Sequence, residues 1–323
     1  MTDRPDEFAW ISRLAALTRG DSRALGLSDD AAIIPSRPGF DLVVSKDALV
    51  EGVHFLPGQP LDLVARRLLR TSLSDLAAKA AEPFGYFLMT AWPADRGWAE
   101  RDAFIAGLAE DGALFGVSLL GGDTVATPGP LTLSATVMGW TPSGGAVLRS
   151  GARQGDLVMV CGCIGDGWLG LQAVLGKLED PTGRLTKHFE TPEPLFALSA
   201  LLRAYARAAA DVSDGLIADL GHVARASGLA AVVDLEGLPL SAEAKTWCGN
   251  RSAEARLTLA TGGDDYAIVC AVAPADADTF LAGVRALGLV AACVGSFSVG
   301  SGVRVCFNGQ TVDVVKPGWT HSL

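Results

Sequence analysis

The sequence lacks any cluster of lysine or arginine large enough to form a basic patch. Its 26 Lys and Arg residues are outnumbered by 36 Asp and Glu residues, so its formal net charge is −10. A chain with this charge repels nucleic acid and anionic membranes, and we expect neither as a partner. An anionic ligand would need something positive between itself and the protein, which points to metal ions.

Long apolar runs and targeting segments are also missing. No apolar stretch approaches the roughly 18 residues that span a bilayer, and the polar start of the chain has none of the features of a signal peptide. The six cysteines form no C-x-x-C pair, and most lie in apolar, strand-like segments. This pattern is typical of core residues in a reducing compartment. We therefore expect a cytoplasmic protein without a zinc site.

What the sequence does have is enough apolar material for two cores. Hydrophobic residues make up 49% and charged residues only 19% of its 323 residues, a length that suggests two domains. Residue patterns predict helices at 7–19, 61–80, 98–115, 167–177, 194–209 and 216–227, and strands at 42–44, 131–140, 156–160, 228–238, 266–273 and 303–315. Pro142–Gly145 interrupts these patterns. We expect two α/β domains, covering residues 1–148 and 149–323.

Seven aspartates share one setting, because each lies beside Gly, Ser or Thr at or near the end of an apolar element. They are Asp30, Asp47, Asp75, Asp123, Asp211, Asp214 and Asp264. Helix capping or a turn explains any one of them. As a converging set they would repel one another, and Mg²⁺ compensates such charges because it prefers oxygen ligands and bridges carboxylates to phosphates. The set therefore predicts several magnesium ions at a nucleotide site.

Paired glycines precede an aspartate twice, at Gly121-Gly122-Asp123 and at residues 262–264. Glycine lets backbone N–H groups approach a phosphate, and the aspartate can hold the metal that the phosphate carries; a simple turn is the alternative.

Residues 165–170 match G-x-G-x-x-G. A dinucleotide site also needs a second parallel strand that ends in an acid about 20 residues on, and none follows. We expect a tight turn that packs a helix on a strand.

Two further side chains are candidates for binding. His54 lies in a loop-like run near the acids, where it is either structural or functional. Arg149 is either a surface arginine or a phosphate clamp, since guanidinium binds phosphate bidentately.

Taken in order, the motifs resemble those of the thiamine-monophosphate kinase family, from about Glu7 to Trp319. They are Asp29-Asp30-Ala31-Ala32, Ser45-Lys46-Asp47, Gly52-Val53-His54-Phe55, residues 72–77, Gly121-Gly122-Asp123-Thr124, residues 149–152, residues 211–216 and residues 262–266. The wider superfamily includes aminoimidazole ribonucleotide synthetase, selenophosphate synthetase and the hydrogenase-maturation dehydratase.

The resemblance implies a two-domain α/β fold in which N-terminal domains pair into a homodimer through a shared β-barrel, with ATP near that interface. Four sets of roles are implied as well. Magnesium ligands would be Asp30, Ser45, Lys46, Asp47, Asp75, Asp123, Asp211 and Asp214. ATP contacts would be Gly122, Asp123, Arg149 and Ser213, and thiamine phosphate contacts would be His54, Asp264 and Trp319. No residue would act as a covalent nucleophile.

Two positions depart from the family pattern. Asp264 stands where the family usually has Glu, which keeps the charge but shortens its reach. Lys46 stands where the family usually has Thr, and a charged lysine cannot ligate a cation. Because side chains alternate along a strand, we expect Lys46 to face away from Ser45 and Asp47 and to serve the metal through its backbone carbonyl. The alternative is that its side chain reaches a substrate phosphate.

The resemblance implies a kinase that moves the γ-phosphoryl group of ATP onto thiamine monophosphate by direct in-line transfer, in thiamine diphosphate biosynthesis. Two alternatives stay open at this point. One is a related superfamily ATPase that acts on another acceptor. The other is a homologue that binds thiamine phosphate without catalysis.

Overall fold

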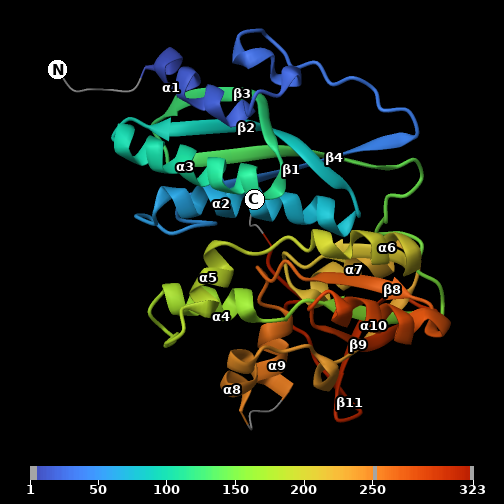
Figure 1. The fold of residues 1–323 in the computed structure, drawn as a ribbon. Helices are drawn as coiled ribbons and strands as arrows, with labels where there is room; N and C mark the ends of the chain where they lie inside the picture. Colours follow the sequence, from blue (N-terminus) through green and yellow to red (C-terminus); the bar gives the residue numbers. More distant parts are fainter. Residues whose placement is uncertain (1–5, 250–252, 321–323) are drawn as a thin grey trace. The chain divides into compact units, whose positions relative to one another are not determined.

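The computed structural model describes residues 6–249 and 253–320. The chain divides into two compact units. The first contains the described residues up to Leu76 together with Ala81–Gly144, and the second contains Ala77–Ala80 and the described residues from Gly145 onward. Each unit combines one sheet with helices (Figure 1), which confirms the expected two-domain α/β class. None of the helices in these residues combines the length and the hydropathy that crossing a bilayer requires.

The first unit is built on a four-stranded sheet in the order β1-β4-β2-β3. Its elements are α1 (Glu7–Leu14), the 3-10 turns η1 (Ala15–Thr18) and η2 (Ser22–Leu27), β1 (Phe40–Val50), α2 (Leu61–Ala78), β2 (Glu82–Pro93), α3 (Trp98–Phe115), β3 (Ser118–Thr127) and β4 (Thr132–Pro142). Strand β2 runs parallel to β3, and the other pairs are antiparallel. The described part of the chain closes no barrel: the sheet is open, with β1 and β3 at its edges.

Helices α2 and α3 lie side by side in the first unit (Figure 1), so closely that a Cβ on Gly107 would lie 2.1 Å from the carbonyl oxygen of Asp62. The predicted apolar positions Val64, Leu68 and Leu76 of α2 are all buried, as are Leu133, Ala135 and Val137 of β4. The sequence pattern therefore identified the buried face of both elements correctly.

The second unit contains a seven-stranded mixed sheet in the order β11-β10-β7-β9-β5-β8-β6. Its strands are β5 (Leu157–Cys161), β6 (Ala206–Asp211), β7 (Ala230–Asp234), β8 (Ile268–Val272), β9 (Ala291–Ser298), β10 (Gly302–Phe307) and β11 (Gln310–Val312). Its α-helices are α4 (Asp166–Val174), α5 (Arg184–Glu190), α6 (Ser199–Tyr205), α7 (Leu216–Ala226), α8 (Ala242–Cys248), α9 (Ala253–Ala260) and α10 (Ala277–Ala286), and its 3-10 turns are η3 (Phe196–Leu198), η4 (Leu235–Gly237) and η5 (Pro274–Asp276).

Two buried clusters in the second unit explain why its central strands are apolar throughout. Val158, Val160 and Val269 belong to one cluster, whereas their strand neighbours Met159 and Cys270 belong to the other. Alternate residues of a strand point to opposite faces, so both faces of this sheet are covered. Cys161 in β5 and Cys270 in β8 are buried and form no disulfide, as expected for small core residues, whereas Cys293 in β9 is exposed.

One predicted helix was wrong. Residues 194–209 were expected to form one helix, but α6 ends at Tyr205 and Ala206–Asp211 is strand β6, which pairs with β8. The alternative interpretation of Gly121 and Gly122 as a simple turn is also wrong, because they lie within strand β3. Strands β2, β3 and β9 were not predicted.

A buried ion-pair cluster joins α2 to α3. The carboxylate of Asp111 is fully buried and accepts from Arg70 Nε at 2.6 Å, Arg70 Nη2 at 2.9 Å and Arg66 Nε at 3.2 Å. By contrast, Asp102 on the same helix forms an exposed pair with Arg13.

We expect Asp111→Ala to lower the free energy of unfolding by about 3–5 kcal/mol, because it removes the carboxylate with which the buried Arg70 forms its ion pair. Asp102→Ala is the matched control and should cost under about 1 kcal/mol, since exposed ion pairs contribute little. Urea unfolding of both variants measures the difference. Equal stabilities would contradict a structural role for the buried cluster.

Candidate functional site

A cavity of about 530 Å³ lies within the first unit. Segments α1 and η2, the loop that follows η2, and strands β1 to β4 supply its lining. Four residues expected at the nucleotide and metal sites line this cavity together: Asp30, Lys46, Gly122 and Asp123. Helix α1 is tied to the same region by a hydrogen bond of 3.0 Å from Trp10 Nε1 to Thr124 Oγ1.

The glycine pair in the cavity wall permits a close approach of two strands. The register of β2 with β3 shifts between Tyr86 and Phe87, which leaves one residue of β3 without a partner. A Cβ on Gly122 would lie 1.8 Å from the carbonyl oxygen of Leu88, and one on Gly121 would lie 2.8 Å from the ring of Phe87. Any larger residue would therefore force the strands apart.

Three other predicted ligands meet where β1 faces α2. Ser45 Oγ donates a hydrogen bond to Asp75 Oδ2. Asp47 lies close enough to Ser72 and Asp75 for both to shift its titration: burial, followed by the negative charge of Asp75, raises the pKa of Asp47 to about 6, and the Ser72 hydroxyl opposes this. The group offers only oxygen atoms.

The pairing of β1 with β4 explains why Lys46 is separated from its neighbours. Ser45 and Asp47 lie opposite Val137 and Ala135, which are buried, whereas Lys46 lies opposite Thr136, which lines the cavity. The expectation that Lys46 faces away from Ser45 and Asp47 is confirmed.

His54 occupies a turn after β1, and its Nδ1 accepts a hydrogen bond of 3.0 Å from the Val50 N–H. A bridge between Glu51 and Phe55 closes this turn. This hydrogen bond holds the imidazole ring against the end of β1.

In the second unit, the loop of Ser213 and Asp214 is the centre of the candidate residues. The Ser213 carbonyl accepts from the Asp264 N–H, and the Asp214 carbonyl accepts from the Trp319 N–H, both at 2.8 Å. The structure thus brings together four residues that are up to 106 positions apart (319 minus 213).

Asp264 has a left-handed backbone, with φ +62°, and its Oδ1 accepts from the Tyr266 hydroxyl at 3.1 Å. Asp211, at the end of β6, is 5% exposed.

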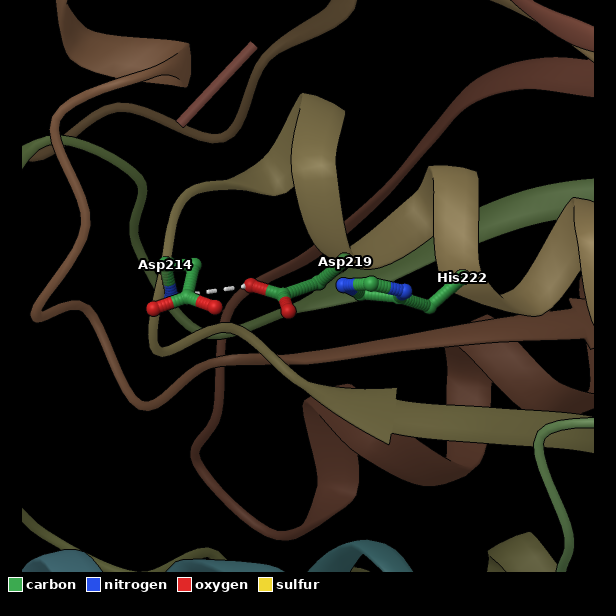
Figure 2. A group of neighbouring side chains, drawn as sticks. All are labelled: Asp214, Asp219 and His222. Atoms are coloured by element: carbon green, nitrogen blue, oxygen red, sulfur yellow. Dashed lines mark hydrogen bonds between the residues drawn. The ribbon is translucent and has the colours of Figure 1, made fainter. Parts of the chain in front are cut away.

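Asp219 is a buried carboxylate that the sequence analysis missed. Its Oδ2 accepts from the N–H groups of Asp214 at 3.0 Å and Gly215 at 3.2 Å, so it holds the loop that carries Asp214 (Figure 2). Burial and the negative charge of Asp214 raise the pKa of Asp219 to about 7, and the positive charge of Arg149 acts against this rise. His222 lies beside both acids, with ligand atoms of the three within 4.8 Å of one another.

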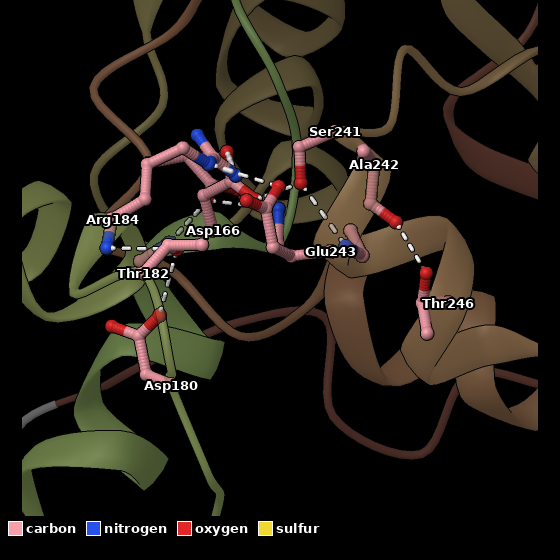
Figure 3. Close-up of polar contacts among 12 residues, drawn as sticks. Asp166, Asp180, Thr182, Arg184, Ser241, Ala242, Glu243 and Thr246 are labelled. Atoms are coloured by element: carbon pink, nitrogen blue, oxygen red, sulfur yellow. Dashed lines mark hydrogen bonds and ion pairs between the residues drawn. The ribbon is translucent and has the colours of Figure 1, made fainter.

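The predicted turn at residues 165–170 packs a helix, as expected. A Cβ on Gly167 would lie 2.2 Å from the Asp264 carbonyl oxygen, and the buried Asp265 carboxylate accepts from the N–H groups of Gly165 and Gly167. The first residue of α4 is fixed separately. Asp166 accepts from Ser241 Oγ at 2.6 Å and from Arg184 Nη2 at 2.9 Å (Figure 3). The start of α4 is thus fixed, and its Gly167 lies directly against the backbone of Asp264.

We expect Asp47→Asn to stabilise the chain at neutral pH without divalent cations. Because the pKa of Asp47 is about 6 when folded and about 3.9 when unfolded, the native state binds more protons between these values. The free energy of unfolding therefore falls as pH rises through that window. The variant lacks this loss, so its advantage in EDTA should reach at most about 3 kcal/mol at pH 7 and become small at pH 4.

Urea unfolding at both pH values, with the exposed Asp95→Asn as control, measures the effect. A variant less stable than wild type at pH 7 would show that the Asp47 carboxylate is not under repulsion.

Comparison with known proteins places the chain in a family. Residues 28–141 match AIR synthase related protein, N-terminal domain, and residues 153–306 match AIR synthase related protein, C-terminal domain. The chain is 54% identical to the thiamine-monophosphate kinase of Caulobacter vibrioides, across 98% of this chain and 91% of that protein. It is 34% identical to the thiamine-monophosphate kinase of Escherichia coli, across 98% of each.

Solved structures agree with these matches. The thiamine-monophosphate kinase from Stenotrophomonas maltophilia superimposes with a TM-score of 0.83 at 35% identity, covering 95% of this chain and 98% of that one. AaThiL, complexed with AMPPCP and TMP, superimposes with a TM-score of 0.76 at 25% identity, covering 97% and 96%. With full-length relatives at this level of identity and both domains matched, the chain belongs to the thiamine-monophosphate kinase family.

Proposed function

We propose that this chain transfers the γ-phosphoryl group of ATP to the phosphate of thiamine monophosphate, giving ADP and thiamine diphosphate. The observation that carries the proposal is the cavity that contains Asp30, Gly122 and Asp123, because it combines carboxylates with a glycine pair in its lining. The relative crystallised with AMPPCP, an ATP analogue, and TMP supports the same pair of substrates. We place the reaction in the cytoplasm, where ATP and free thiols are maintained.

The acceptor explains why this site needs no general base. A phosphate monoester has its second pKa near about 6, so its oxygen is already deprotonated at neutral pH. Phosphoryl transfer then depends on positioning and charge neutralisation more than on covalent chemistry. Direct in-line attack without a phospho-enzyme follows from these properties.

The donor atoms fit magnesium. Ser45, Asp47 and Asp75 offer only oxygen atoms, and the pKa of Asp47 is raised by burial and by the neighbouring Asp75 carboxylate. With Asp30 and Asp123 in the cavity, and Asp211 and Asp214 in the second unit, they are the proposed ligands. Bound magnesium would neutralise phosphate charge. The backbone carbonyl of Lys46 stays a proposed additional ligand.

Two further sets of residues would hold the substrates. For ATP they are Gly122, Asp123, Arg149 and Ser213. For thiamine monophosphate they are His54, Asp264 and Trp319. Trp319 is 50% exposed, its backbone N–H is bonded to the Asp214 carbonyl, and the Lys316 ammonium lies 5.1 Å from the centre of its ring.

We expect the purified protein to convert thiamine monophosphate and Mg-ATP to thiamine diphosphate and ADP. Asp75→Asn should lower turnover at least about a hundredfold, the scale of losing one strong electrostatic contact. The exposed Asp102→Asn should match wild type. Chromatography of the thiamine esters and nucleotides measures both products. ADP with inorganic phosphate would indicate an ATPase with another acceptor, and binding without turnover would indicate a non-catalytic homologue.

The homodimer is also a proposal, and the edge of the first sheet supports it. Strand β1 has one neighbour in the chain, and its Leu42 and Val44 are 44% and 52% exposed. An edge that presents unpaired backbone groups and apolar side chains readily pairs with a second copy. A shared barrel made by two such sheets would cover both features.

Light scattering at micromolar concentration should give a dimer. Val44→Lys should shift it towards monomer, because it places a charge on the proposed interface. Val299→Lys should leave the mass unchanged, since Val299 is 74% exposed on the second unit. A monomeric wild type, or equal masses for all three proteins, would rule out β1 as the interface.

A further inference from the structure

Among the described residues that line the cavity of the first unit, Lys46 is the only basic one. Four acids line it as well: Glu7, Asp29, Asp30 and Asp123. A lysine in such surroundings would ordinarily be expected to form an ion pair. Within residues 6–249 and 253–320, however, no carboxylate oxygen lies within 4.0 Å of its ammonium nitrogen. The charge is therefore available to a ligand.

The local structure gives Lys46 a defined direction. Its strand partner Thr136 and the neighbouring Ser134 line the same cavity, so the side chain leaves β1 on that face. Ser134 Oγ also donates to the Asp47 carbonyl at 2.7 Å, which fixes the backbone next to Lys46. The ammonium group thus extends from a held strand into a space that Gly121 and Gly122 of β3 also line.

We propose that Lys46 Nζ binds the phosphate groups of the nucleotide in this cavity, an inference that rests on the proposed function. A compact ammonium with three donors suits phosphate oxygens, which present several acceptors in no fixed plane. The acids around it would repel a polyphosphate without a cation. Lys46 therefore adds positive charge that the chain itself supplies, beside any magnesium bound by the acids.

Binding of phosphate by Lys46 and simple neutralisation of the surrounding acids predict different results. If Lys46 only offsets the acids, its removal should strengthen the binding of divalent cations and affect all nucleosides alike. If it binds phosphate, its removal should weaken ligands in proportion to their phosphates. Affinity for adenosine, which has no phosphate, separates the two roles.

The test is isothermal titration calorimetry of the full chain with Mg-ATP, Mg-ADP and adenosine. Lys46→Thr should weaken Mg-ATP at least about tenfold, the equivalent of 1.4 kcal/mol, and Mg-ADP less. Adenosine should change less than about twofold, because a single lost charge contributes little to an uncharged ligand. Lys46→Arg should recover most of the affinity for Mg-ATP. The exposed Lys177→Thr removes the same charge from the second unit and should behave as wild type.

Three results would overturn the inference: an Mg-ATP affinity within about threefold of wild type in Lys46→Thr, an equal loss for adenosine, or no nucleotide binding by wild type. Calorimetry requires no turnover. A protein that binds Mg-ATP through Lys46 yet forms no thiamine diphosphate would refute the proposed acceptor and leave the role of Lys46 supported.

Discussion

Like charges held close together are the constraint on which the candidate site depends. Asp47 lies beside Asp75, and Asp219 lies beside Asp214, in a chain whose net charge is already −10. Burial and the neighbouring carboxylate raise the pKa of Asp47 to about 6 and of Asp219 to about 7. Such arrangements destabilise the folded state at neutral pH, and a bound cation relieves them. The rest of each unit must supply the stability that these groups remove.

The two units hold their acids in different ways. In the first unit a strand and a helix hold the acids, because Ser45 and Asp47 project from β1 towards Asp75 on α2. In the second unit a loop is held by backbone hydrogen bonds from Asp264 and Trp319 and by the Asp219 carboxylate. A substitution that shifts any one of these three segments would displace Asp214 as well, so their effects should not be additive.

The parts of the structure that the sequence predicted are those with a strong local pattern. The alternation of side chains along Ser45-Lys46-Asp47 can be recognised without knowledge of distant residues. It correctly predicted that Lys46 lies on the other face of the strand from Ser45 and Asp47. Strand β3 was not predicted, because Gly122 is required there by the carbonyl of Leu88, a contact between segments far apart in sequence. Residues 206–211 are rich in alanine, which favours a helix, but pairing with β8 overrides that preference.

Asp219 escaped detection even though its contacts are local. Within its helix it looks like an ordinary polar residue, and its role as an acceptor appears only in the geometry of the helix start, where the N–H groups of Asp214 and Gly215 point at it. The spacing was nevertheless informative. An acid in the first turn of a helix, four and five residues after a Gly and an Asp, can accept the free N–H groups that every helix start leaves.

Strand β1 shows how one short segment serves two kinds of chemistry. Oxygen donors leave it on the face of α2, and an ammonium group leaves it on the face of the cavity, one residue apart. Because the backbone separates the two faces, the charge at position 46 can change without moving Ser45 or Asp47. A protein that binds an anionic substrate with acidic residues must obtain positive charge from ions or from its own side chains. Strand β1 permits positive charge from bound ions and from its own lysine at the same time. The share that each contributes can therefore change by substitution at position 46 alone.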